Sequence, residues 1–241
     1  MAETNERGSV DPVNSVGQAD SVHGVGPSAP TEQEPHPPRL PSAHIVARVH
    51  DGTELIVRQW RSSDLDTYHR AIHESYVHLQ PWMPWALAEP QEIDAHAEIL
   101  QRFSGRWTHD NVVYGIFLDA RAVGGTGLHN RIGESGWEIG YWIHADFEGR
   151  GFVSAVVQAL TDEAFVDASV DRVEIRCDAA NLRSSAVPVR LGYAMVGHEA
   201  RVPVAAAETT LGTVYRLVRA NWPGANAGGS HSGDASTLRS S

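Results

Sequence analysis

Gly149, Arg150 and Gly151 have the residue types and the spacing of an anion-binding turn. Glycine adopts positive φ angles and lets the backbone approach a bulky ligand closely. The arginine between the two glycines carries a guanidinium group that can bind a phosphate through two N–H donors. Apolar residues at helical spacing begin directly after the turn. The first N–H groups of a helix have no partner inside it and lie at the positive end of its dipole. The turn therefore predicts a phosphate site, and a pyrophosphate would suit it best.

Neither of two common nucleotide motifs describes this turn. Its glycine spacing differs from the dinucleotide fingerprint, and no acidic ribose ligand is evident on a following strand. No Gly-Lys-Ser or Gly-Lys-Thr follows, which excludes a Walker loop. An ordinary strand-to-helix turn with an exposed arginine remains the alternative. The separate run of residues 124–127, GGTG, lies in strand context, where glycines indicate a bulge or a close backbone approach.

The turn is positioned by a strand before it and a helix after it. Residues 137–144 alternate as a two-faced strand, and Phe152, Val156 and Leu160 recur at helical spacing. Short turns predict an antiparallel meander of strands 112–118, 122–129 and 137–144, and the helix then crosses to a parallel strand near 172–177. The other expected elements are strands near 45–49, 55–60, 195–202 and 213–218, helices near 64–76 and 91–103, and a short helix after Asn181. The expected class is α/β (α+β), a mixed, mostly antiparallel sheet flanked by helices.

Composition limits the chain to one sizeable folded domain. The 241 residues are 41% hydrophobic, enough to bury one core. Residues 1–41 hold seven of the thirteen prolines and almost no large apolar side chains, and residues 223–241 are rich in Gly and Ser. Both ends are therefore expected to be disordered tails, which leaves residues 42–222 as the domain.

Charge and cysteine content restrict the compartment and the partners. No signal-peptide core follows Met1 and no apolar run could span a bilayer, so we expect a cytoplasmic protein with no membrane partner. The single cysteine, Cys177, excludes an internal disulfide and is expected to be packed in the core. A formal net charge of −11 argues against a nucleic-acid partner and is compatible with an amine-bearing acceptor.

Several motifs together resemble one enzyme family. The order of strand, EGRG turn, amphipathic helix, strand and then NLRSSAVPVRLGY resembles the GNAT N-acyltransferase superfamily, in its RimJ/RimL-like branch of ribosomal-protein N-acetyltransferases. The resemblance covers residues 42–222 and is strongest over 137–193. The strand at 55–60 with its following Ser-Ser-Asp, the segment PWMPW at 81–85, and the strand EIGYWI at 138–143 agree with it.

The resemblance implies an acyl-CoA substrate and the residues that bind it. In this family the glycine turn holds the pyrophosphate of acetyl-CoA, and the asparagine that opens the next helix contacts the pantetheine arm. The residues expected to bind the donor are Trp142, Ile143, Gly149, Arg150, Gly151, Phe152, Val153 and Asn181. The family usually has Gln or Arg where this chain has Glu148, and Ala or Gly in place of Val153. Because backbone amides do most of the phosphate binding in such a turn, binding is expected to survive both changes.

Acyl transfer to an amine needs a proton acceptor for the amine and a proton donor for the departing thiolate. Glu138 is the candidate base because its strand leads directly into the phosphate turn; a surface position or a cross-strand ion pair is the alternative. Ser184 lies one helical turn after Asn181, and in this branch a serine at the matching position is thought to protonate the thiolate. A helix-surface or capping serine is the alternative.

The acceptor side is less well marked. Trp82 and Trp85 flank a proline turn and are candidates for the wall of the acceptor cleft, with core aromatics as the alternative. His69 and His73 lie one helical turn apart, but no further ligand completes a metal site, so no metal is expected. Members of this branch often form homodimers, although the sequence shows no interface.

Three functions remain open at this point. The first is transfer of acetyl from acetyl-CoA to a primary amine, such as the α-amine of a protein N-terminus, by direct attack in a ternary complex. The second keeps the fold but uses a small-molecule amine as acceptor or a longer donor such as succinyl-CoA. The third is a CoA-binding regulatory module without catalysis, for which Glu148 and Val153 are the supporting features.

Overall fold

A computed structural model describes residues 39–105, 107–108 and 111–223 of the chain. Eight strands form a single sheet in the order β1-β2-β3-β4-β5-β6-β8-β7. The expected tails at 1–41 and 223–241 lie almost entirely outside the described residues. The strands are β1 His44–Arg48, β2 Glu54–Gln59, β3 Asn111–Leu118, β4 Arg121–His129, β5 Gly136–Ile143, β6 Arg172–Asp178, β7 Ala194–Ala200 and β8 Leu211–Val218.

From β1 to β5, each strand is antiparallel to the next. Short turns join β3 to β4 and β4 to β5, which confirms the predicted meander, whereas helices α1, Leu65–Leu79, and α2, Ile93–Phe103, lie in the long connection between β2 and β3. Helix α3, Phe152–Ala164, carries the chain from β5 to β6, which pairs with β5 in parallel. The last strand, β8, inserts between β6 and β7 and is antiparallel to both. The mixed, mostly antiparallel sheet expected from the sequence is confirmed.

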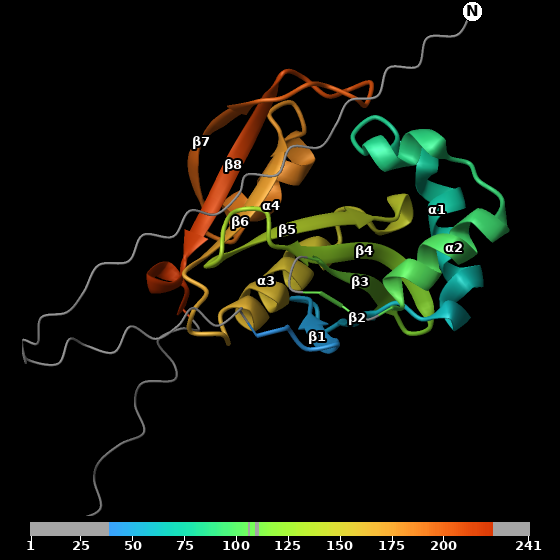
Figure 1. Cartoon of the computed structure of the whole chain (residues 1–241), viewed down its shortest axis with the longest axis horizontal. Coiled ribbons are helices and arrows are strands. Elements are labelled where there is room, and N and C mark those ends of the chain that lie inside the picture. The colour runs from blue at the N-terminus through green and yellow to red at the C-terminus, as the bar shows by residue number, and fades with distance from the viewer. Residues whose placement is uncertain (1–38, 106, 109–110, 224–241) are drawn as a thin grey trace, which may run out of the picture. The chain divides into compact units, whose positions relative to one another are not determined.

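Helices cover both faces of the sheet. The larger core packs the apolar face of α3 against the central strands, with Trp137, Ile139 and Val156 almost fully buried. A second core on the other face packs α1 and α2 against Trp60 and Phe117. Helix α4, Leu182–Arg190, contacts β6 and β7. In Figure 1, β6, β7 and β8 are turned steeply away from the direction of β5.

The expected elements are all present, with small differences at their ends. Helix α1 extends to Leu79, three residues beyond the expected end, because Ile72, Ser75 and Leu79 continue its buried face. The strand expected to reach residue 202 ends at Ala200, where the chain leaves the sheet for the β7–β8 loop. Within the described residues, every helix is too short or too polar to cross a membrane.

Candidate active site

The sheet opens into a wedge between β5 and β6. The two strands pair in parallel only over Gly136–Arg172, Trp137–Val173 and Glu138–Glu174. Beyond these pairs, β5 continues to Ile143 and β6 continues to Asp178 with no bridge between them. One edge of β5 therefore has backbone N–H and C=O groups that face the wedge instead of a neighbouring strand, so they are available to a ligand.

A cavity of about 670 Å³ extends from this wedge. On one side it is lined by Tyr141, Asn181 and Ser184, which belong to β5 and the start of α4. On the other side it is lined by Glu138 and by the aromatic segment that contains Trp82 and Trp85. The cavity therefore brings Asn181 and Ser184 together with Glu138 and the candidate acceptor residues, whereas Ile143 and the glycine turn at 149–153 are not among its lining residues.

The glycine turn has the backbone that an anion site needs. Gly149 and Gly151 have φ values of 71° and 80°, in the left-handed region that favours glycine, and Gly151 is the N-cap of α3. A Cβ built on Gly149 would have no neighbour within 4 Å, so the space above it is open. Phe152 is buried and Val153 packs against the same core, which leaves their backbone N–H groups as the parts available to a phosphate. These residues fit the pyrophosphate of a CoA donor.

The Glu148 carboxylate contacts two side chains. One carboxylate oxygen lies 2.6 Å from Nη1 of Arg183, in the first turn of α4, and the other lies 3.2 Å from Nε2 of His78 on α1. The Arg150 guanidinium lies 4.9 Å from the centre of the Phe147 ring. The carboxylate that departs from the family pattern is thus directed into ion pairs, and it holds an arginine beside the phosphate turn.

The start of α4 brings Asn181 and Ser184 to the cavity. Asn181 is the N-cap, and its Oδ1 accepts a hydrogen bond from the Ser184 N–H at 3.1 Å. The Ser184 hydroxyl donates to the Tyr141 hydroxyl at 3.2 Å, and the Tyr141 hydroxyl donates to the Ser184 carbonyl at 2.9 Å. Burial raises the pKa of Tyr141, so its phenol stays protonated. Tyr141 and Ser184 therefore form a neutral hydroxyl pair that faces the wedge.

Glu138 lies where the two strands separate, and its side chain is 14% exposed. Burial raises the pKa of the Glu138 carboxyl, and the charges of Arg131 and Arg176 act in the opposite direction. The guanidinium groups lie 3.5 Å and 3.7 Å from the carboxylate oxygens, a looser contact than a direct bidentate pair. The ion pair expected as the alternative for Glu138 is present, yet the same carboxylate lines the cavity and is accessible to a ligand.

Trp82 and Trp85, the candidates for the acceptor wall, line the cavity and are not part of the buried core. Trp85 is 41% exposed, and the centre of its ring lies 5.9 Å from the ring centre of Trp142. Both side chains line the cavity. The backbone N–H of Ala207, in the β7–β8 loop, donates to the Pro81 carbonyl at 2.9 Å. Two loops that are far apart in sequence therefore meet beside the cavity.

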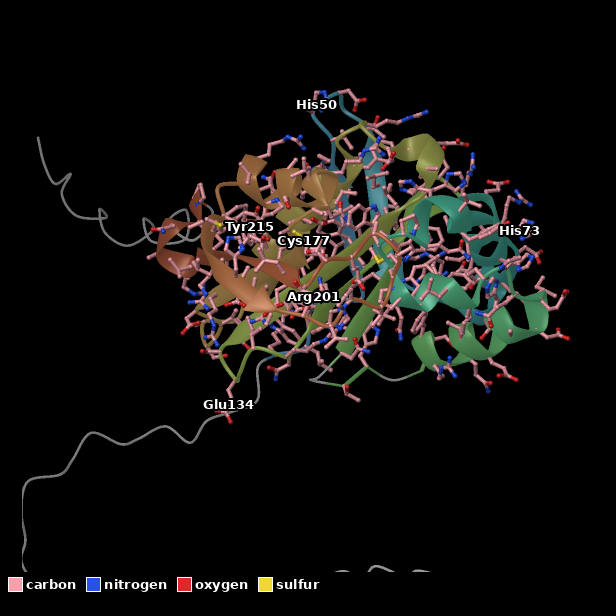
Figure 2. The ribbon with its side chains drawn as sticks, turned by 90° about the horizontal axis from the view of Figure 1, so that it is seen from above. His50, His73, Glu134, Cys177, Arg201 and Tyr215 are labelled. Carbon is pink, nitrogen blue, oxygen red and sulfur yellow. The ribbon has the colours of Figure 1, made fainter. Side chains whose placement is uncertain are left out.

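Cys177 and Ile143 have mainly packing roles. Cys177 is buried, and burial raises the pKa of its thiol, which disfavours the nucleophilic thiolate. Figure 2 shows Cys177 among the packed side chains of the interior. The expectation that it is packed is confirmed. Ile143 lies against the larger core and is not among the residues that line the cavity. Among the described residues, no three His, Cys, Asp or Glu side chains could hold a metal ion.

Tyr141 and Arg183 are part of this site and are not among the residues selected from the sequence. Alternation along β5 places Tyr141 on the face opposite Glu138, and only the opening between β5 and β6 lets both line one cavity. Arg183 follows Asn181 by two residues, and its proximity to the candidate turn depends on how α4 packs beside α3. A hydroxyl-bearing residue on the wedge strand is the signal that could have identified Tyr141.

The comparisons with known proteins agree with this geometry. Residues 54–194 match the family model described as an acetyltransferase (GNAT) domain. The Bacillus subtilis (strain 168) protein named "Putative ribosomal N-acetyltransferase YdaF" is 29% identical over 143 residues, which cover 58% of this chain and 77% of that protein.

Two solved structures show the same fold. RimJ of Mycobacterium smegmatis, solved with a CoA disulfide, matches with a TM-score of 0.64 at 20% identity and covers 79% of this chain and 95% of its own. RimL, the ribosomal L7/L12 α-N-protein acetyltransferase solved with coenzyme A, matches with a TM-score of 0.61 at 20% identity and covers 72% of this chain and 97% of its own. Since the family model spans more than half of the sequence, the chain belongs to the GNAT family and is an acetyl-CoA-dependent acetyltransferase.

Proposed function

We propose that this enzyme transfers acetyl from acetyl-CoA to the α-amine of a protein N-terminus. The observation that carries the proposal is the position of Glu138, which is half-buried at the point where β5 and β6 separate and lines the cavity. The names of YdaF and RimL, which refer to ribosomal proteins, support the same choice.

The transfer needs one proton removed and one supplied. The amine nitrogen forms a bond to the thioester carbonyl carbon, and the carbon–sulfur bond breaks. The Glu138 carboxylate takes the amine proton, directly or through a water, and the Ser184 hydroxyl supplies a proton to the thiolate. An α-amine has a reference pKa of about 8, so a useful fraction is already neutral near pH 7.

The donor half of the site has a separate set of roles. The backbone N–H groups at the start of α3, together with Gly149 and Arg150, bind the pyrophosphate. Asn181 contacts the pantetheine arm, and the unpaired edge of β5 supplies a backbone N–H for the developing oxyanion. Tyr141 holds the Ser184 hydroxyl in place. We further propose a cytoplasmic location, where ribosomal proteins are available, and a homodimer as in related enzymes.

A screen of acceptors tests the proposal. Purified enzyme is incubated with acetyl-CoA and a panel of peptides with free N-termini, matched peptides with blocked N-termini and one internal lysine, and small amines including an aminoglycoside. Thiol release measures turnover, and mass spectrometry of the product locates the acetyl group.

We expect acetylation on the α-amine of the free peptides and none on blocked peptides. Turnover only with small amines would overturn the choice of acceptor. Faster turnover with succinyl-CoA would overturn the choice of acyl group. Binding of CoA without turnover by any acceptor would support the regulatory module instead.

A further inference from the structure

His129 lies beside Glu138 on the cavity face of the sheet. It is the last residue of β4, and its register partner on β5 is Glu138. Directly opposed residues on neighbouring strands project from the same face, with Cβ atoms about 5 Å apart. Both side chains line the cavity. The imidazole is therefore placed next to the carboxylate that receives the proton of the acceptor amine.

The orientation of the His129 ring is fixed by one hydrogen bond. Its Nδ1 lies 2.6 Å from Oδ1 of Asn111, the first residue of β3. An amide oxygen is only an acceptor, so Nδ1 carries the hydrogen and Nε2 has a free lone pair. The hydrogen bond to Asn111 is the only one that the ring makes among the described residues, so Nε2 is available to a ligand in the cavity.

The backbone below the ring leaves space that a side chain at Gly127 would fill, whereas a Cβ at Gly140 would make an ordinary contact. A Cβ on Gly127 would lie 3.0 Å from Nε2 and 2.8 Å from the Val112 carbonyl oxygen, and a Cβ on Gly140 would lie 3.4 Å from Nε2. The glycine run on β4, which no nucleotide motif explains, thus allows the imidazole to lie close along the sheet.

The charge state of His129 agrees with a role as a hydrogen-bond acceptor. Burial, followed by the nearby Arg131 guanidinium, lowers the pKa of His129 to about 4. The groups around His129 and Glu138 in the cavity lining include Arg131 and Arg176, which both pair with Glu138, and the neutral amide of Asn111. At neutral pH the imidazole is uncharged, and Nε2 accepts but does not donate.

We infer that His129 is a second amine-binding residue of the active site, which accepts through Nε2 a hydrogen bond from the nucleophilic nitrogen beside Glu138. This inference rests on the proposed function. A neutral primary amine has two N–H groups and one lone pair. With one N–H directed to Glu138 and the other to His129, the lone pair is left for the thioester carbonyl carbon. Glu138 takes the proton, and His129 orients the nitrogen.

The arrangement defines the class of acceptor. A secondary amine, such as an N-terminal proline or an N-methylated residue, has only one N–H when neutral and cannot satisfy both groups. The site therefore selects primary amines through His129. A residue that only supports the fold would not couple to the number of N–H groups on the acceptor.

The experiment compares two substitutions on two acceptors. His129→Phe keeps a ring of similar size and removes the acceptor nitrogen. The matched control is His73→Phe, on the exposed face of α1, outside the cavity and at the edge of the molecule in Figure 2. The best peptide acceptor and its N-methylated form are assayed by steady-state kinetics, and the dissociation constant of CoA is measured by calorimetry.

For the primary amine, His129→Phe should lower kcat/KM about tenfold, the effect of one lost hydrogen bond to a reacting group. It should lower kcat/KM for the N-methylated peptide much less, and CoA affinity should stay within about twofold of the wild type. His73→Phe should change none of these values. Equal losses on both acceptors, or no loss on either, would overturn the role of His129 while leaving the proposed function intact. Absence of turnover by the wild type would refute the proposed function, and the inference would fall with it.

Asn111→Asp provides a second test with a different readout. A carboxylate at Nδ1 raises the pKa of His129, and below that pKa Nε2 is protonated and cannot accept. The ratio of kcat/KM in the variant to kcat/KM in the wild type should be low at acidic pH and should rise as the pH increases. A pH profile parallel to that of the wild type would contradict the inference.

Discussion

The ion pair between Glu148 and Arg183 should weaken the binding of CoA. Arg183 lies at the start of α4 and Glu148 lies in the turn before α3, so the pair joins the two helices that border the wedge. The carboxylate is a negative charge beside the proposed pyrophosphate site, and it occupies an arginine that could contact the phosphates. Glu148→Gln removes the charge and keeps the size of the side chain.

The expected gain follows from the exposure of the pair. Arg183 is 79% exposed and Glu148 is 30% exposed, so the ion pair itself contributes at most about 1 kcal/mol to stability. Coulomb's law gives roughly 0.5 kcal/mol for two unit charges about 8 Å apart in water. Relief of repulsion with a doubly charged pyrophosphate is then about 1 kcal/mol, or about fivefold in the dissociation constant.

Calorimetric titration with CoA at low and high salt measures the effect. Glu148→Gln should bind CoA about fivefold more tightly at low salt and by less at high salt, because salt screens exposed charges. Arg183→Ala should weaken binding more in the Glu148→Gln background than in the wild type. Asp171→Asn is the control, because it changes the net charge by the same amount as Glu148→Gln. Asp171 lies directly before β6, at the end of that strand that pairs with β5 and not at the opening. Unchanged or weaker binding by Glu148→Gln, with no added importance for Arg183, would refute the reasoning.

Three further predictions concern the chemistry and the entrance of the site. Because burial raises the pKa of Glu138 and the base acts when ionised, wild-type kcat/KM should fall as pH drops through that pKa. Glu138→Gln should lower kcat at least about 100-fold and abolish this fall of kcat/KM at low pH, because the base is gone. Its thermal midpoint should be equal to or higher than that of the wild type, since the variant no longer buries a charge. Tyr141→Phe removes the partner of the Ser184 hydroxyl and should lower kcat about tenfold with little change in CoA affinity, whereas an equal loss of affinity would indicate a binding role. Glu208 accepts the Val204 and Ala205 N–H groups in the β7–β8 loop, so Glu208→Ala should raise KM for the acceptor and leave CoA binding unchanged; a change confined to CoA affinity would contradict the loop's assignment to the acceptor side.

The strands and helices that carry the donor site are largely encoded in local sequence. Alternation along β5, the glycine turn and the spacing of apolar residues in α3 predict a strand, an anion-binding turn and a helix. The structure has the strand, the helix and a turn with two glycines at positive φ, and anion binding by that turn stays a prediction. Their order resembles the GNAT family, and the family match confirms that resemblance. These signals work because each depends on neighbours within one or two turns of chain.

The contacts that complete the site depend on long-range packing. His129 meets Glu138 through the register of β4 and β5, and Tyr141 reaches Ser184 because β5 and β6 separate after three residue pairs. No local pattern specifies where two strands stop pairing. The ion pair of Glu148 with Arg183 likewise spans 35 residues and depends on how α4 lies relative to the turn before α3.

The crystal structure of the enzyme with a bisubstrate ligand, CoA joined through an acetyl bridge to the α-nitrogen of an acceptor peptide, tests the central claim most directly. The pantetheine arm should pass between β5 and β6 with its pyrophosphate at Gly149 and Gly151, and the α-nitrogen should lie beside Glu138. The peptide should leave along the wall formed by Trp82 and Trp85. A ligand bound outside the wedge, or an α-nitrogen remote from Glu138, would contradict the account.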